Sequence, residues 1–151
     1  LPPALTALCL GQHFTQALGP LPAQLQVLNL RLCSHFNVPL GALRPALREL
    51  RLGDAFDQPL QALPPTLEVL VLGDALSQPL QCALPPALRT FQVGNLFNSP
   101  VELPGTLRSL SMGDSYTHLM ELPSGLRELR IGQSYMHAVP PLPLAHVCCS
   151  Q

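Results

Sequence analysis

The sequence repeats itself about every twenty residues, and this period restricts the possible folds more than any other feature. Each unit begins with a leucine, which proline follows in six of the seven complete units. The units start at Leu1, Leu21, Leu43, Leu63, Leu84, Leu103 and Leu122, and an incomplete eighth unit starts at Leu142. A single coil of this length cannot bury its own apolar side chains. We therefore expect residues 1–151 to form one domain of stacked coils.

Three positions in every complete unit, the fifth, the eighth and the tenth, are apolar. They alternate with other residues at the end of the pattern, as in Leu50, Arg51 and Leu52, which is the period of a short β-strand. The pattern predicts one parallel sheet on the concave face of a solenoid. The expected strand centres are Leu8, Leu28, Leu50, Leu70, Phe91, Leu110 and Leu129.

Glycine and proline mark the rest of each unit. Glycine follows the strand in six units, and we expect the backbone to turn there because glycine adopts conformations that other residues avoid. The path back to the next strand contains Pro39, Pro59, Pro79 and Pro100, in addition to the prolines that begin the units. Proline fixes φ and lacks an N–H. The sequence therefore predicts an extended, polyproline-like or irregular convex side with little α-helix.

One column of the repeat holds six of the seven aromatic residues. Its members are Phe14, Phe36, Phe56, Leu76, Phe97, Tyr116 and Tyr135. We interpret the column as an internal stack that fills the coil, and not as a surface on which a ligand stacks. The next residue in six units is short and polar, as in Asn37 and Asp57, and we expect it to bond nearby backbone and so to satisfy the buried backbone at each corner.

The composition is that of an ordered chain, because 47% of the residues are hydrophobic and the net charge is −1. Every apolar run is broken well before the roughly 18 residues that a membrane span needs. The five cysteines occupy unrelated repeat positions, which does not suit a disulfide framework. The chain also lacks an Asn-x-Ser/Thr glycosylation acceptor. We expect a cytoplasmic or nuclear protein without a membrane partner.

The repeat, L-P-x-x-L-x-x-L-x-L-G-x-x-F-N-x-P-L, resembles the FNIP repeat, a short subclass of leucine-rich repeat. The best local matches run from Leu43 to Leu60 and from Leu84 to Val101. The resemblance covers residues 1 to about 141 and implies a curved right-handed solenoid with a protein-interaction role. The second unit departs from it by an insertion around residues 32–35, and the sixth lacks the turn proline. The twenty-residue repeats of bacterial effectors share part of the frame but lack the aromatic column.

Patterns that carry catalysis or metal binding are poor. There is no glycine-rich phosphate loop, G-x-S-x-G, H-E-x-x-H or C-x-x-C, so we do not expect an enzyme or a small-molecule substrate. Cys148 and Cys149 adjoin each other, but only His146 nearby could activate a thiol. In two pairs, His13 with His35 and His118 with His137, the histidines recur at one position in neighbouring units. With Cys33, the first pair offers three of the four ligands that zinc typically takes. An ordinary polar surface explains these residues better, and we expect no cofactor.

The strand face carries a marked excess of positive charge. Its outward positions hold seven of the eight basic residues and only three acids, so the face sums to about +4 and the remainder to about −5. The candidate partner-binding residues are Arg48, Arg51, Arg89, Arg108, Arg127 and Arg130, with Arg89, Arg108 and Arg127 in consecutive units at the centre. Like charges at ~4.8 Å spacing repel, and an acidic partner relieves that repulsion. Arginines that only keep the sheet soluble are the simpler alternative.

These features predict a non-enzymatic scaffold that binds a protein partner across the concave strand face, and the charge of the face favours an acidic partner. A metal-binding or nucleic-acid-binding repeat module is the alternative. Nucleic acid is the less favoured partner because lysines and exposed aromatic side chains for base stacking are absent from the pattern. No polar cap precedes Leu1, so we also expect the chain to be a fragment of a longer array.

Overall fold

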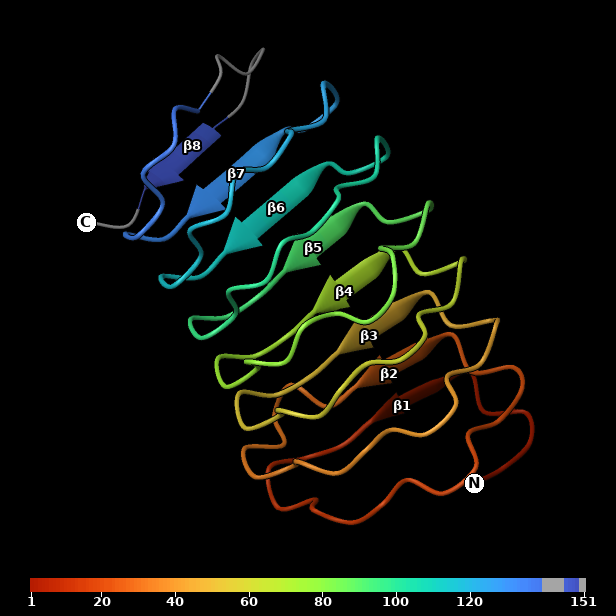
Figure 1. Ribbon diagram of the computed structural model, residues 1–151. Helices are drawn as coiled ribbons and strands as arrows, with labels where there is room; N and C mark the ends of the chain where they lie inside the picture. Colours follow the sequence, from red (N-terminus) through yellow and green to blue (C-terminus); the bar gives the residue numbers. More distant parts are fainter. Residues whose placement is uncertain (140–145, 150–151) are drawn as a thin grey trace.

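The computed structural model describes residues 1–139 and 146–149, and in it short parallel strands lie side by side in one eight-stranded sheet (Figure 1). Strand order follows the chain, and each strand pairs in parallel with the next. The strands are β1 Ala7–Cys9, β2 Val27–Asn29, β3 Glu49–Arg51, β4 Val69–Val71, β5 Thr90–Gln92, β6 Ser109–Met112, β7 Glu128–Ile131 and β8 His146–Cys149. Helix is absent from the residues described. The predicted parallel sheet and its seven strand centres are confirmed.

The register of the sheet places like residues of successive units side by side. Leu28 pairs with Leu50, Leu50 with Leu70, and Leu70 with Phe91, and all four side chains are 0% exposed. Their neighbours at the seventh and ninth positions point to the opposite face, because side chains alternate along a strand. The last strand, β8, pairs Val147 with Leu129. Its centre lies five residues after Leu142, whereas each β2–β7 centre lies seven residues after the leucine that begins its unit.

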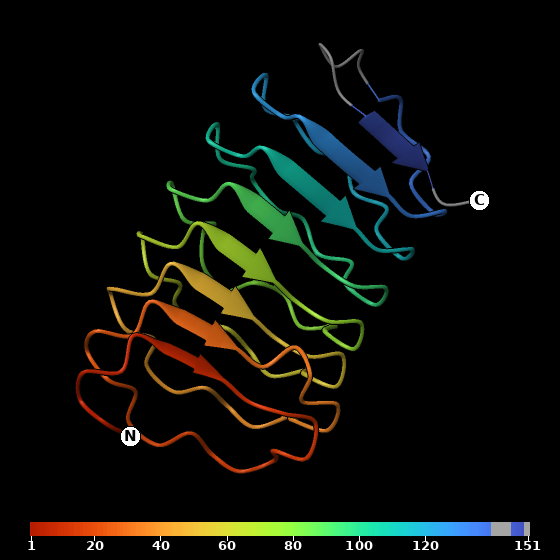
Figure 2. The ribbon, with the colours of Figure 1, turned by 180° about the vertical axis from the view of Figure 1, so that it is seen from behind.

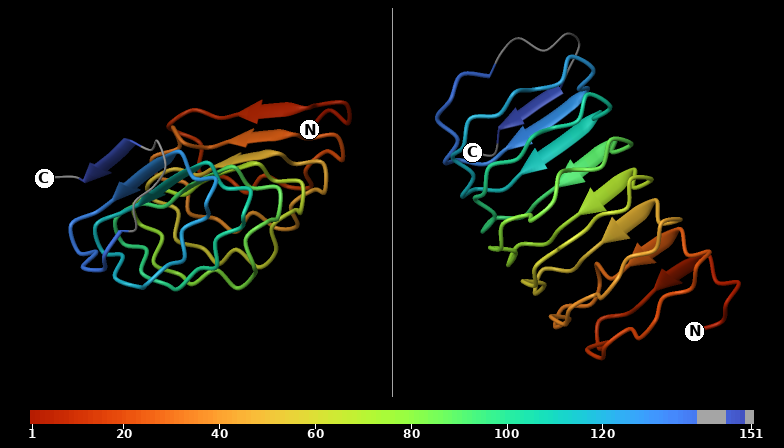
Figure 3. Two further views of the ribbon diagram at one scale, coloured as in Figure 1. Left: turned by 90° about the horizontal axis from the view of Figure 1, so that it is seen from above. Right: turned by 45° about the vertical axis from the view of Figure 1, so that its right-hand side comes forward.

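The chain returns on one side of the sheet in irregular segments, which lie in front of the strands in Figure 1 and behind them in Figure 2. Figure 3 shows the same coils from above. Two turns shape each coil. The first is closed by a hydrogen bond such as Leu67 N–H to Pro64 O, and the second by one such as Phe56 N–H to Gly53 O. Cavities of about 660 and 440 Å³ separate neighbouring return segments, whereas the strands pair directly. The coils therefore lie closer together at the sheet than at the back.

The aromatic column forms an internal stack, as predicted. Ring centroids of Phe14 and Phe36, and of Phe36 and Phe56, lie 5.9 and 6.2 Å apart, and Leu76 continues the column. Beyond it, Phe97, Tyr116 and Tyr135 stack at 6.4 Å spacing. Members inside the stack are at most 1% exposed. These rings fill the coil and are not available to stack against a ligand.

Glycine follows the strands for a different physical reason from the one that we expected. The only glycines with positive φ in the described chain are Gly19 and Gly41, which are not the strand-end glycines. At Gly94 an added Cβ would lie 2.5 Å from the carbonyl oxygen of Gly73 in the previous coil. An added Cβ at Gly53, Gly73, Gly113 or Gly132 would also overlap backbone of the previous coil. The chain turns after these strands, as predicted, but glycine is required there by the close approach of two coils and not by a positive φ.

The short polar residues bond backbone at the corners of the coils, as predicted, and the backbone that they bond belongs to the next coil. The Asn37 side-chain oxygen accepts the N–H of Asp57 at 2.9 Å, and an Asp57 carboxylate oxygen accepts the N–H of Ser77 at 2.8 Å. A second ladder follows the glycines, where Asp74 accepts the N–H of Asn95 and Asn95 that of Asp114. Each ladder satisfies backbone donors where the strand pairing has ended.

Replacing a central leucine tests the stacked core. Leu70 is 0% exposed, and Leu70→Ala is expected to lower the free energy of unfolding by about 2–5 kcal/mol, the usual range for a fully buried leucine. Leu8→Ala changes the half-buried equivalent in β1 and should lower it less. Urea denaturation of both variants measures the difference, and equal losses would contradict a core in which each coil is buried by two neighbours.

Adding one methyl group tests the contact between glycine and backbone. Gly94→Ala should destabilise the fold by about 1–3 kcal/mol, because the new Cβ overlaps the backbone of the previous coil. Gly105→Ala is the matched control, since no atom lies within 4 Å of the Cβ that it introduces. The control should stay within about 0.5 kcal/mol of the wild type. If both variants unfold at the same urea concentration, the crowding at Gly94 does not exist in solution.

The ladder at Asp57 should make stability depend on pH. Hydrogen bonds from Ser77, above all from its backbone N–H, lower the pKa of Asp57 below 3.8. The ionised Asp57 side chain stabilises the folded state fully at a pH above that ordinary pKa. This stabilisation is lost as the pH falls through the lower pKa that Asp57 has in the folded protein. Asp57→Asn keeps the oxygen acceptor that Asn37 and Asn98 provide at the same position, but it does not titrate. In thermal melts at falling pH, the wild type should lose more stability below about pH 4 than the variant; parallel losses would contradict the assignment.

Candidate partner-binding face

The sixth residue of each unit lies just before its strand and forms a column that we call the amino edge. Its members from the second to the seventh unit are Gln26, Arg48, Glu68, Arg89, Arg108 and Arg127. Backbone hydrogen bonds hold the column in register, because the N–H of Arg108 donates to Arg89 O and that of Arg127 to Arg108 O, both at 2.8 Å. The three predicted central arginines therefore follow one another on consecutive coils, with exposed side chains.

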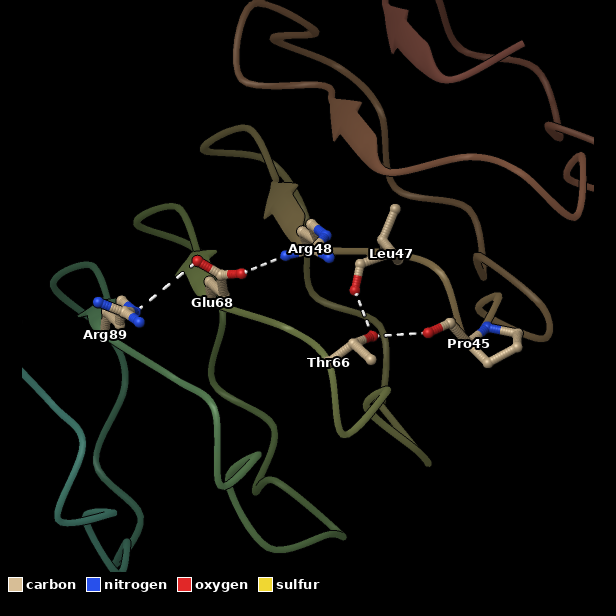
Figure 4. A network of polar contacts seen from close by, with 6 residues as sticks. All are labelled: Pro45, Leu47, Arg48, Thr66, Glu68 and Arg89. Carbon is tan, nitrogen blue, oxygen red and sulfur yellow. Dashed lines mark hydrogen bonds and ion pairs between the residues drawn. The ribbon is translucent and has the colours of Figure 1, made fainter. Parts of the chain in front are cut away.

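Glu68 neutralises part of this column (Figure 4). One of its carboxylate oxygens lies 2.7 Å from Arg48 Nη1 and the other lies 3.7 Å from Arg89 Nε. Arg48 and Arg89 thus share one carboxylate. The Arg89 contact exceeds hydrogen-bond length, and its side chain is 68% exposed, so this pair holds Arg89 only weakly.

The ninth position of the units supplies the other two predicted arginines. Arg51 in β3 pairs with Glu49 of the same strand at 2.6 Å, and both side chains are about 70% covered. Arg130 lies in β7, is exposed, and has no acidic partner within 4 Å in the described chain. The structure does not bring Arg51 and Arg130 together, because the strands that carry them are separated by β4, β5 and β6.

Arg108 is held by backbone and not by an acid. Its Nη1 donates to the carbonyl oxygen of Gly125, at 3.1 Å, and lies 3.4 Å from that of Leu107. An added Cβ at Gly125 would collide with the same nitrogen. The Arg108 guanidinium therefore occupies space beside Gly125 that a side chain at this position would take. The sequence signal for this contact, a glycine two residues before Arg127, was overlooked because it is not a recurrent position.

A pocket of about 180 Å³ lies between two of these arginines, and we call it the arginine pocket. It is lined by Glu68, Ala87, Arg89, Thr106 and Arg108. The Thr106 hydroxyl lies 2.8 Å from both Pro86 O and Leu88 O. Thr66, two units earlier, makes the equivalent contacts with Pro45 O and Leu47 O (Figure 4). Because the hydroxyl donates its proton to backbone, the hydrogen-bond donors left in the pocket belong to the arginines.

The rest of the face is divided by charge. The outward residues of the middle strands are uncharged: Val69, Val71, Thr90, Gln92, Ser109 and Ser111. Beyond the carboxyl ends of the strands lie the exposed acids Asp54, Asp74 and Asp114, for which no ion pair occurs in the described chain. The face therefore has a basic amino edge, an uncharged centre and an acidic carboxyl edge.

The candidate metal ligands are not brought together. Cys33 is 0% exposed, and its thiol donates to backbone carbonyl oxygens, at 3.3 Å in the case of Gly11 O. His13 and His35 are exposed. No group of three or more histidine, cysteine or acidic side chains that could hold a metal ion occurs in residues 1–139. Burial also raises the pKa of the Cys33 thiol, which keeps it protonated and unreactive.

The second histidine pair belongs to a corner of the coils. His118 and His137 each hydrogen bond through Nε2 to a carbonyl oxygen of the previous coil, at 3.2 and 2.9 Å. Their rings meet the edges of Tyr116 and Tyr135. Cys148 and Cys149 lie in β8, but their side chains are outside the described residues.

Comparison with known proteins identifies the fold. A solved structure, described as that of CroV588, "a novel circular LRR protein structure", is similar to this chain with a TM-score of 0.75 and 24% sequence identity. The match covers 97% of this chain but 27% of that chain, so this chain spans about a quarter of the solved protein's length. No model of a protein family and no curated protein matches the sequence. The fold is a leucine-rich-repeat solenoid, and the predicted fold class is confirmed.

Within the residues described, the structure contains no helix with the length and apolar character needed to cross a bilayer.

Proposed function

We propose that this chain is a non-enzymatic scaffold that binds a protein partner across its strand face, with the amino edge as the centre of contact. The observation that carries the proposal is a group of three exposed arginines, Arg108, Arg127 and Arg130, that have no acidic partner within 4 Å in the described chain. They lie in β7 or just before β6 and β7, so three of the five arginines without such a partner are grouped at one end of the sheet. The other two are Arg31 and Arg44. An acidic surface of a partner matches this end.

The architecture supports a broad contact rather than a substrate site. The arginine pocket is small and open, and the uncharged centre of the face is a pleated surface of short side chains. The larger cavities lie between return segments at the back and are lined mostly by apolar side chains and backbone. Leucine-rich-repeat solenoids commonly serve as scaffolds of this kind, since stacked coils present an extended surface.

A nucleic-acid partner is the second candidate, and two features of the face weigh against it. The aromatic rings that bases would stack on lie inside the coils. The acids of the carboxyl edge, Asp54, Asp74 and Asp114, would repel a phosphate backbone that spans the sheet. A protein partner with localised acidic groups avoids both problems.

The narrower assignments belong to the same proposal. We infer that the repeats are of the FNIP type, on the strength of the L-P-x-x-L-x-x-L-x-L-G-x-x-F pattern, and that residues 1–151 form one domain of a longer array. The predicted compartment is the cytoplasm or the nucleus. The irregular positions of the cysteines support it, because a secreted disulfide framework would space them regularly.

Neutralising the amino edge tests the proposed function. In a pulldown from lysate, Arg89→Gln/Arg108→Gln/Arg127→Gln should lose the partners that the wild type captures, because charge-assisted contacts are removed. The control, Gln16→Glu/Gln61→Glu/Gln81→Glu, lowers the net charge equally at exposed positions outside the strands and should keep them. Circular dichroism and thermal melts check that both are folded. An unchanged set of partners in the first variant would show that binding occurs elsewhere.

A further inference from the structure

The arginine pocket suggests what chemical group the partner presents, if the proposed function holds. Arg89 and Arg108 face one small cavity from neighbouring coils. The acid in its lining, Glu68, is shared with Arg48, which holds it at 2.7 Å. The cavity therefore keeps an excess of positive charge, to which Arg127 on the next coil adds.

The two guanidinium groups are prepared for a ligand in different ways. Arg108 is fixed by the Gly125 carbonyl through Nη1, which leaves Nε and Nη2 without a partner in the described chain. Arg89 contacts Glu68 through Nε at 3.7 Å, and within the described residues its terminal nitrogens make no hydrogen bond or ion pair. An anion that enters the pocket would meet one guanidinium already oriented and a second that turns toward it at little energetic cost.

The number of donors favours a phosphoryl group over a carboxylate. A carboxylate carries one charge on two oxygens, which a single guanidinium satisfies with a bidentate pair of hydrogen bonds. A phosphorylated side chain has three acceptor oxygens and a charge of about −1.5 to −2 at pH 7, so it can bind two guanidinium groups at once.

We propose that the arginine pocket binds the phosphoryl group of a phosphorylated side chain on the partner protein, held between Arg89 and Arg108. This inference rests on the proposed function of the strand face. The uncharged centre of the sheet lies next to the pocket and accommodates the residues that flank the phosphorylated one. Glu68 opposes binding and sets a limit on affinity.

The direct test uses three short peptides of one glycine- and serine-rich sequence, with phosphoserine, glutamate or serine at the centre, titrated by NMR or calorimetry at low salt. The phosphoserine peptide should bind at least tenfold more tightly than the glutamate peptide, and the serine peptide should not bind. Inorganic phosphate is titrated alongside. It should compete, but more weakly than the peptide. Equal binding of the glutamate and phosphoserine peptides would overturn the proposal, as would inorganic phosphate that binds as tightly as the peptide.

Two substitutions with opposite expected effects on phosphoserine binding test whether the ligand occupies the arginine pocket. Arg108→Gln should weaken phosphoserine binding at least tenfold, and Glu68→Gln should strengthen it, because the variant removes the carboxylate from the pocket lining. Arg31→Gln is the matched control, since Arg31 is exposed and does not line the pocket. Its binding should equal that of the wild type. A Glu68→Gln variant that binds no more tightly, or an Arg31→Gln variant as weak as Arg108→Gln, would contradict the assignment to this pocket.

A second arm separates this inference from the proposed function. Lysate is treated with a protein phosphatase, or with the phosphatase and its inhibitor, before the pulldown. Partners whose capture depends on the amino edge should disappear after dephosphorylation and remain when the inhibitor is present. If they remain after dephosphorylation, the phosphoryl proposal fails while the strand face still binds protein. If only nuclease treatment removes them, the partner is nucleic acid and both proposals fail.

Discussion

The stacking of like side chains in adjacent coils is the interaction on which the rest of this structure depends. A coil of about twenty residues has no interior of its own, so the leucines of one coil are buried only by the coils before and after it. Leu28 and Leu50 are 0% exposed because each has two neighbours, whereas Leu8 in the first coil stays partly exposed. The same register then aligns every other column, including the aromatic rings, the hydrogen-bonded ladders and the arginines of the amino edge.

Those parts of the fold that follow from periodicity alone could be predicted from the sequence. Strand centres and the buried aromatic column recur at fixed positions, and recurrence of an apolar side chain in a stacked array means burial. The reason for glycine and the partners of the short polar residues were missed because they involve two coils at once. Gly94 is constrained by the backbone of Gly73, and the partner of the Asn37 side chain is Asp57, twenty residues later. A pattern within one unit does not contain these distances.

The candidate site shows the same limit. The excess of positive charge on the strand face could be predicted, since alternation along a strand determines which residues point outward. The pairing of the charges could not, because it depends on side-chain rotamers across neighbouring coils. The Glu68 carboxylate contacts both Arg48 and Arg89. Arg108 donates a hydrogen bond to the Gly125 carbonyl oxygen and pairs with no acid in the described chain. The arginine pocket depends on these side-chain conformations, which the repeat pattern does not specify.

The ion pairs also show which of the exposed arginines can be explained by the solubility of the sheet alone. Arg48 and Arg51 each have a close carboxylate partner, so for them the simpler explanation of a solvated, charge-paired sheet is sufficient. It does not extend to Arg108 and Arg127, which lie on consecutive coils and have no acid within 4 Å in the described chain. The sixth position places no demand on the side chain, because the column is held by backbone hydrogen bonds and Gln26 or Glu68 fits equally well. Folding therefore does not require like charges at the sixth position. Binding of a negatively charged partner explains why arginines occur there in consecutive units.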